Sequence, residues 1–181
     1  MAQPETQFIK PETILKQIGL QPGMQVADLG CGAGYFSLPA ARLAGSRGKV
    51  YAIDVQKSVL AQLRKEAQSQ GVAGLEMVWS DIEVPGATKI PAHSLDMVFL
   101  INTLFQAQNK RGVIGEAKRL LKPDGLLLLI DWQPGDAAMG PKIDKRLDLV
   151  SIRQIMKESG FVEERPIAAG SHHFGLLFKA M

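Results

Sequence analysis

The order of apolar and helical segments is the feature that most constrains the fold of this chain. Short apolar runs lie at residues 24–29, 49–53, 75–79, 95–101 and 126–131, and longer stretches of helical periodicity separate them. This alternation is typical of a parallel sheet with helices on both faces. The unbroken leucine run in the fifth segment fits a strand that is buried on both sides. We therefore expect an α/β fold.

Proline and glycine mark the ends of several predicted helices, as they commonly do. The predicted helices run from Pro11 to the residue before Gly19, and then over residues 34–44, 58–70, 110–121 and 148–159. A loop is expected at residues 82–94 and a turn at residues 123–125, because both segments are interrupted by proline and glycine.

The pattern changes after residue 131. Residues 132–146 contain two prolines and two glycines and have no clear period, which predicts a long loop that can act as a lid. Strands are expected at residues 161–167 and 173–179, and the short link between them permits only antiparallel pairing. No second domain is indicated, so we expect one domain over residues 1–181, with residues 1–23 as a lead-in helix segment.

Composition and charge indicate the class of protein and the compartment in which we expect it. The 181 residues are 46% apolar and 22% charged, which is ordinary for a soluble globular protein. A single cysteine excludes an intramolecular disulfide, and the sequence shows no signal-peptide core and no membrane-spanning run, so we expect a cytoplasmic protein. Basic residues come as scattered pairs, with a net charge of +3 and a pI near 9.0. This distribution favours solvated helix faces and does not exclude nucleic acid as a partner.

One segment carries most of the chemical information. Asp28 ends the first predicted strand, and Gly30, Gly32 and Gly34 follow before a helix. Glycines let the backbone approach a ligand closely, and the helix start offers free N–H groups. A dinucleotide site needs the spacing G-x-G-x-x-G and room for a pyrophosphate. The spacing here is G-x-G-x-G, and the carboxylate of Asp28 would repel a diphosphate but suits a ligand that carries an ammonium and a sulfonium.

This segment resembles the first motif of class I S-adenosylmethionine-dependent methyltransferases. Residues 49–54, 79–82, 96–102 and 120–125 are similar to four further motifs of that family, in the same order. The closest likeness is to small bacterial and archaeal enzymes near the ubiquinone and menaquinone biosynthesis methyltransferases. It implies a Rossmann-like, seven-stranded, mostly parallel sheet of order 3-2-1-4-5-7-6 with an antiparallel C-terminal strand. The cofactor would lie at the switch point between strands one and four.

The resemblance also implies roles for individual residues. Gly30, Gly32 and Gly34 would shape the loop under the methionine part and the ribose of S-adenosylmethionine. Asp28 would stabilise that loop and the ammonium group. Asp54, at the end of the second strand, would accept hydrogen bonds from both ribose hydroxyls.

The remaining predicted site residues follow later strands. Val55 would pack on the adenine, while Asp81 and the N–H of Ile82 would bind its edge; helix capping is the alternative role for Asp54 and Asp81. The predicted cofactor residues are Asp28, Gly30, Cys31, Gly32, Gly34, Tyr35, Phe36, Asp54, Val55, Asp81, Ile82 and Asn102. The predicted acceptor residues are Phe105, Gln106 and Trp132.

No residue is given a catalytic or metal-binding role. Cys31 lies inside the cofactor loop, where a free cysteine is commonly a small buried hydrophobe. His93 falls in a loop, and His172 and His173 are adjacent, so the histidines lack the spacing of metal ligands. Methyl transfer from a sulfonium depends mainly on positioning, and a general base is needed only for a protonated acceptor of high pKa.

The methyl acceptor remains open. The fourth strand is not followed by the Asn/Asp-Pro-Pro-Tyr/Phe sequence, which argues against methylation of adenine amino groups or protein glutamine. A small-molecule acceptor is favoured; an RNA or protein methyltransferase, a binding protein without catalysis and a nicotinamide enzyme with an unusual loop are the alternatives. We expect the segment through Lys10 and the loop at residues 132–146 to cover the acceptor. The sequence does not indicate the oligomeric state.

Overall fold

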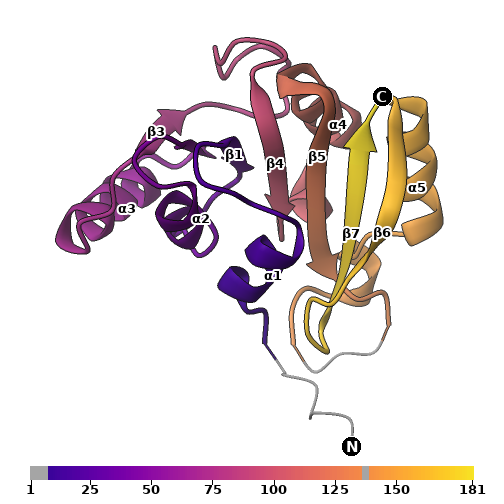
Figure 1. Ribbon diagram of the computed structural model, residues 1–181. Coiled ribbons are helices and arrows are strands. Elements are labelled where there is room, and N and C mark those ends of the chain that lie inside the picture. Colours follow the sequence, from indigo (N-terminus) through magenta and orange to yellow (C-terminus); the bar gives the residue numbers. More distant parts are fainter. Residues whose placement is uncertain (1–7, 136–138) are drawn as a thin grey trace, which may run out of the picture.

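A computed structural model describes residues 8–135 and 139–181, which form a seven-stranded sheet with helices on both faces (Figure 1). The strands are β1 (Gln25–Leu29), β2 (Lys49–Asp54), β3 (Leu75–Trp79), β4 (Leu95–Ile101), β5 (Leu121–Trp132), β6 (Phe161–Ile167) and β7 (His173–Ala180). Their order is β3-β2-β1-β4-β5-β7-β6. The strands from β1 to β5 pair in parallel, whereas β7 runs antiparallel to both of its neighbours. The expected fold and strand order are therefore confirmed.

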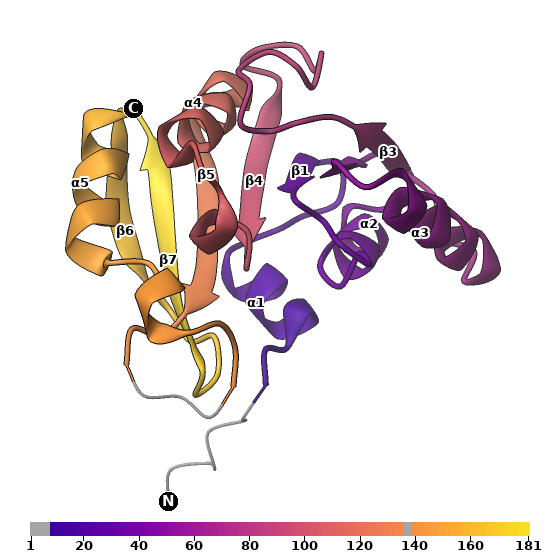
Figure 2. The ribbon, with the colours of Figure 1, turned by 180° about the vertical axis from the view of Figure 1, so that it is seen from behind.

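The helices form two layers, which can be followed from the two sides of the sheet (Figures 1 and 2). The helices are α1 (Pro11–Gln17), α2 (Ser37–Ala44), α3 (Lys57–Ser69), α4 (Lys110–Leu120) and α5 (Leu149–Glu158), with short 3₁₀ helices η1 (Leu104–Gln106) and η2 (Ile143–Lys145). Within the described ranges, no helix has the length and apolar character needed to cross a membrane.

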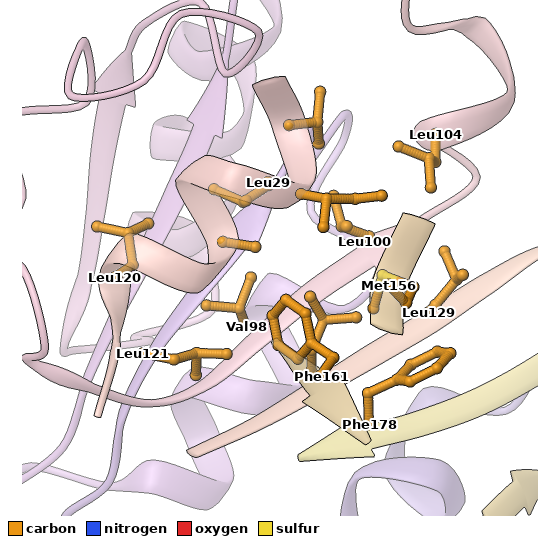
Figure 3. Packing of buried hydrophobic residues seen from close by; sticks show 14 of the residues in the cluster. Leu29, Val98, Leu100, Leu104, Leu120, Leu121, Leu129, Met156, Phe161 and Phe178 are labelled. Carbon is orange, nitrogen blue, oxygen red and sulfur yellow. The ribbon is translucent and has the colours of Figure 1, made fainter. Parts of the chain in front are cut away.

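Alternating side chains of the central strands supply the core on both faces, as the pleat of a strand requires. Val98 and Leu100 of β4 belong to the cluster under α4 and α5, which Figure 3 shows together with Met156 of α5. Met97 and Phe99 point to the opposite face and pack in the cluster of α1 and α2. Burial on both faces explains why the central strands are almost purely apolar.

Two predicted boundaries are wrong. The helix expected from Gly34 begins only at Ser37, because the preceding residues form turns and Gly34 has a left-handed φ of 83°. The fifth strand begins at Leu121, and the turn expected at residues 123–125 lies inside it as a local irregularity. Asp124 reaches a φ of 63° there, so the strand bends without ending.

A buried carboxylate on α4 holds the loop that precedes β4. Glu116 is fully buried and accepts hydrogen bonds from Gly86 N (2.7 Å), Thr88 Oγ1 (2.5 Å) and the Arg119 guanidinium (2.8 Å). Burial raises the pKa of Glu116, but the hydrogen bonds from Arg119, Thr88 and Gly86 outweigh it and hold the pKa below its usual value. The hydrogen bonds from Gly86 and Thr88 to Glu116 thus fix a long loop against α4.

Replacing Glu116 by Gln should lower the free energy of unfolding at pH 7 by about 2–4 kcal/mol, because Arg119 loses a buried partner. Since the folded pKa lies below the unfolded one, this contribution is present above the unfolded pKa and is lost as pH falls through the folded pKa. Urea unfolding at neutral and acidic pH measures both effects. Glu158→Gln breaks an exposed pair with Arg111 and should cost at most about 0.5 kcal/mol. Equal losses in the two variants would contradict the interpretation.

Candidate functional site

A cavity of about 460 Å³ lies at the carboxyl ends of β1, β2, β3 and β4. This is where the strand order reverses between β1 and β4, the usual ligand position in open α/β sheets. Its lining residues are Asp28, Gly30, Cys31, Gly32, Ala33, Tyr35, Phe36, Asp54, Val55, Gln56, Ser80, Asp81, Ile82, Glu83, Ile101, Asn102, Thr103, Gln106 and Ala107. The volume lies in the range of small-molecule sites.

All the charged side chains that line the cavity are acidic. Carboxylates come from Asp28, Asp54, Asp81 and Glu83, and among the described lining residues there is no lysine, arginine or histidine. A low-dielectric cleft lined by negative charge attracts cations and repels phosphate groups. The electrostatics therefore select for a cationic ligand.

Backbone hydrogen bonds fix the glycine loop to the end of β2. The N–H groups of Gly30 and Cys31 donate to the carbonyl of Ile53 at 2.8 and 2.9 Å. Gly32 N donates to Asp54 Oδ2 at 3.1 Å. Gly32 has a φ of 51° and open space where a Cβ would point. These hydrogen bonds hold the loop against the end of β2, and the opposite side of the loop faces the cavity.

Asp28 is a buried acid under this loop. The Ser37 hydroxyl donates to Asp28 Oδ2 at 2.6 Å. Burial raises the pKa of Asp28 to about 6, the hydrogen bond from Ser37 opposes that rise, and the negative charge of Asp54 adds to it. A cation placed in the cavity would favour the ionised form of Asp28.

The turn after β2 is held from two directions. Asp54 Oδ1 accepts a hydrogen bond from Gln56 N at 2.9 Å, so each carboxylate oxygen has one backbone donor. The indole N–H of Trp79 donates to the carbonyl of Val55 at 2.9 Å, and Lys57 Nζ lies 3.7 Å from the Trp79 ring centroid. The position of Val55 therefore depends on Trp79, which the sequence did not indicate.

Glu83 connects the loops that follow β3 and β4. Asp81 Oδ1 accepts from Glu83 N at 2.8 Å, and Ile82 between them is buried. The Glu83 carboxylate accepts from Gln108 N at 3.2 Å and Asn109 N at 2.6 Å. These bonds close one side of the cavity.

The end of β4 closes the opposite side. A Cβ on Gly30 would lie 2.6 Å from Thr103 Oγ1, so only glycine permits this approach between the loops after β1 and β4. Asn102 has a φ of 52°, and its buried Oδ1 has no hydrogen-bond donor within the described residues; the same is true of Ser80 Oγ. Both residues line the cavity, and unsatisfied buried polar atoms of this kind call for a partner.

The structure brings eleven of the twelve predicted cofactor residues to the cavity, and Gly34 is the exception. A Cβ on Gly34 would lie 2.3 Å from Leu63 Cδ1, so this glycine serves the packing of α3. The cavity lining that the sequence missed consists of Ala33, Gln56, Ser80, Glu83, Ile101, Thr103 and Ala107. Each is the chain neighbour of a predicted residue, which is the signal that could have found them.

The predicted acceptor residues are separated. Gln106 lines the cavity, whereas Phe105 lines a neighbouring hollow. Trp132 ends β5 and packs against His173, with ring centroids 4.2 Å apart and the ring planes tilted by 36°. Burial lowers the pKa of His173 to about 4, with smaller contributions from neighbouring positive groups, so its imidazole is neutral at pH 7.

The two predicted covering segments are only partly described. Residues 1–7 and 136–138 lie outside the described residues. Ile9 is buried, and its carbonyl accepts a hydrogen bond from Tyr35 Oη at 2.7 Å, which ties the lead-in segment to the cavity rim.

Cys31 is buried beside Leu60 and Leu63. Burial raises the pKa of its thiol far above the usual value, and the charges of Asp28 and Asp54 act in the same direction. A neutral buried thiol is not a nucleophile at pH 7. In the described part of the chain, no three His, Cys, Asp or Glu side chains gather as metal ligands would.

Residues 20–166 match the family described as "Methyltransferase domain". The ubiquinone/menaquinone biosynthesis C-methyltransferase UbiE of Shewanella pealeana is 27% identical over 149 residues, which are 82% of this chain and 57% of that protein. Aklanonic acid methyltransferase DauC of Streptomyces sp. (strain C5) is 40% identical over 76 residues, which are 42% of this chain and 33% of that protein. The chain thus spans between a third and just over half of the length of these curated relatives.

A solved structure is similar over nearly the whole chain. It is a SAM dependent methyltransferase from Aquifex aeolicus with a TM-score of 0.88 and 27% sequence identity. The match covers 97% of this chain and 92% of the other. The sheet and the loops at its carboxyl edge therefore have a counterpart of the same size.

The placement of Gly34 leads to a stability prediction. Gly34→Ala should lower the free energy of unfolding by about 1–3 kcal/mol, because the added Cβ meets buried Leu63 and the φ is left-handed. Gly32→Ala is the control, since Gly32 also has a left-handed φ but open space for a Cβ, and it should cost about 1 kcal/mol. Urea unfolding of both variants measures the difference. A larger loss for Gly32→Ala would refute the packing role of Gly34.

Proposed function

Because the chain belongs to the methyltransferase domain family, we propose that it transfers a methyl group from S-adenosylmethionine to a small-molecule acceptor. The observation that carries this proposal is the lining of the cavity, with four carboxylates and no basic side chain among the described residues. S-adenosylmethionine bears an ammonium and a sulfonium, which such a lining attracts. A nicotinamide dinucleotide bears a diphosphate, which it repels.

The residues present fit this cofactor. Each oxygen of Asp54 accepts one backbone N–H and keeps a lone pair for a ribose hydroxyl. Asp28 would face the ammonium side. Val55 would pack on the adenine, whose amino group would donate to Asp81 and whose ring nitrogen would accept from the N–H of Ile82. When bound, the cofactor supplies a methyl group on a positively charged sulfur that leaves as a neutral thioether. The chain's own contribution is to bind, orient and exclude water.

The acceptor in this proposal is a small molecule held near Gln106 and Asn102. The curated relatives bear the names of enzymes of quinone biosynthesis and of aklanonic acid methylation, which supports an acceptor of that size. The single buried thiol suits the reducing conditions of the cytoplasm, which we propose as the location.

Asp28→Asn should separate stability from binding. Because burial raises the folded pKa of Asp28 above the unfolded value, ionising this acid costs stability as pH rises through that interval. The variant should therefore gain about 1–3 kcal/mol of unfolding free energy at pH 7.

The same variant should bind S-adenosylmethionine about ten- to a hundredfold more weakly, since a charge-assisted contact is lost. In the parent, affinity should fall as pH drops below about 6, where Asp28 takes up a proton; in the variant this dependence should be weaker. Calorimetry from pH 5 to 8, a range of about three pH units around that pKa, measures both. Unchanged affinity in a folded variant would contradict the assignment.

The function is tested in two steps. Calorimetry should show tighter binding of S-adenosylhomocysteine than of NADH. Mass spectrometry should then find a labelled small molecule after the protein is incubated with isotopically labelled donor and a metabolite extract. Label found only in RNA or protein would mean that the acceptor is a macromolecule and not a small molecule. Binding without any labelled product would indicate a protein without catalysis. Tighter binding of NADH would overturn the proposal.

A further inference from the structure

Asp131, near the end of β5, is a buried acid outside the cofactor cavity. It has no solvent-exposed surface. Its Oδ2 accepts a hydrogen bond from Phe105 N at 3.1 Å, and its Oδ1 accepts from Trp132 N at 2.9 Å. One carboxylate therefore joins the end of β5 to the 3₁₀ helix η1 that follows β4.

The helix η1 stands between two hollows. Gln106 and Ala107, at its end, line the cofactor cavity. The same two residues and Phe105 line a second hollow of about 720 Å³, whose other walls come from Lys110 at the start of α4, from η2 and its flanking residues, and from α5. A shift of η1 would therefore change the shape of both hollows at once.

The carboxylate of Asp131 accepts two backbone hydrogen bonds, which an apolar side chain could not do. Burial raises the pKa of Asp131 to about 6, while the N–H groups of Trp132, Phe105 and Leu104 and the charge of Lys110 oppose that rise. At pH 7 the ionised form prevails and both oxygens can accept. Protonation would remove the negative charge and turn one oxygen into a hydroxyl, which is a weaker acceptor, so the backbone contact of that oxygen would weaken.

We propose that Asp131 is a positioning residue, whose carboxylate holds η1 as the wall against which the methyl acceptor lies. This inference rests on the proposed function. It gives different roles to two acids near strand ends. Asp28 lies under the methyl donor, and Asp131 lies behind the part of η1 that would contact the acceptor. Asp131 acts through the backbone of Phe105 and touches neither substrate.

The experiment compares Asp131→Asn with the parent. The side-chain amide places an NH₂ where an acceptor is needed, so the backbone amide of Phe105 or Trp132 should exchange hydrogen at least about tenfold faster. Turnover at saturating labelled donor, with the metabolite extract as acceptor, should fall at least about tenfold. The affinity for S-adenosylhomocysteine should stay within about threefold of the parent. Met156→Ala, a cavity variant in the core under α5, controls for a general loss of stability.

A pH profile adds a readout that a purely structural role would not move. At saturating donor, turnover of the parent should fall below pH about 6 with the protonation of Asp131, whereas protonation of Asp28 appears as weaker donor binding. Unchanged amide exchange in Asp131→Asn, unchanged turnover, or an equal loss of turnover in Met156→Ala would overturn the role of Asp131. Absence of any labelled product with the parent protein would instead overturn the proposed function.

Discussion

The close approach of two loops at the centre of the sheet sets the geometry of the whole site. Gly30 after β1 lies against Thr103 after β4, with no room for a Cβ between them. From this contact the chain turns to opposite faces, toward α2 on one side and toward η1 and α4 on the other. The cavity is the space that this divergence leaves.

Two buried carboxyl groups near strand ends have different surroundings. Asp28 and Asp131 are the next-to-last residues of β1 and β5. Burial raises the pKa of each to about 6. A buried carboxyl is destabilising unless hydrogen bonds compensate it. Here a hydroxyl, from Ser37, satisfies Asp28, whereas backbone N–H groups satisfy Asp131. Asp28 lines the cavity and can accept from a ligand there, whereas Asp131 lies outside the cavity and accepts from the backbone.

Local patterns in the sequence were enough to predict the strands, and the resemblance to class I methyltransferases supplied their order and most of the cavity residues. Asp28, the glycines and Asp54 stand at strand ends, where the fold class alone brings them to one edge. The contacts between distant positions could not be predicted. Glu83 binds backbone N–H groups 25 and 26 residues away, and Trp79 reaches the carbonyl of Val55. Such pairs depend on loop paths, which neither periodicity nor spacing encodes.

Arg146 holds the described parts of the segment at residues 132–146 together. The Arg146 guanidinium donates to the carbonyls of Gln133 at 2.6 Å, Met139 at 2.8 Å and Pro141 at 3.1 Å. Those bonds tie the described ends of the loop together, and Gly140 lies so close to the Trp132 ring that a Cβ would meet it at 2.4 Å. These bonds stabilise the loop and use three of the five N–H donors of the guanidinium, which also lines the hollow beside η1. Positive charge from Lys110, Lys145 and Arg146 therefore borders the hollow that η1 separates from the cofactor cavity.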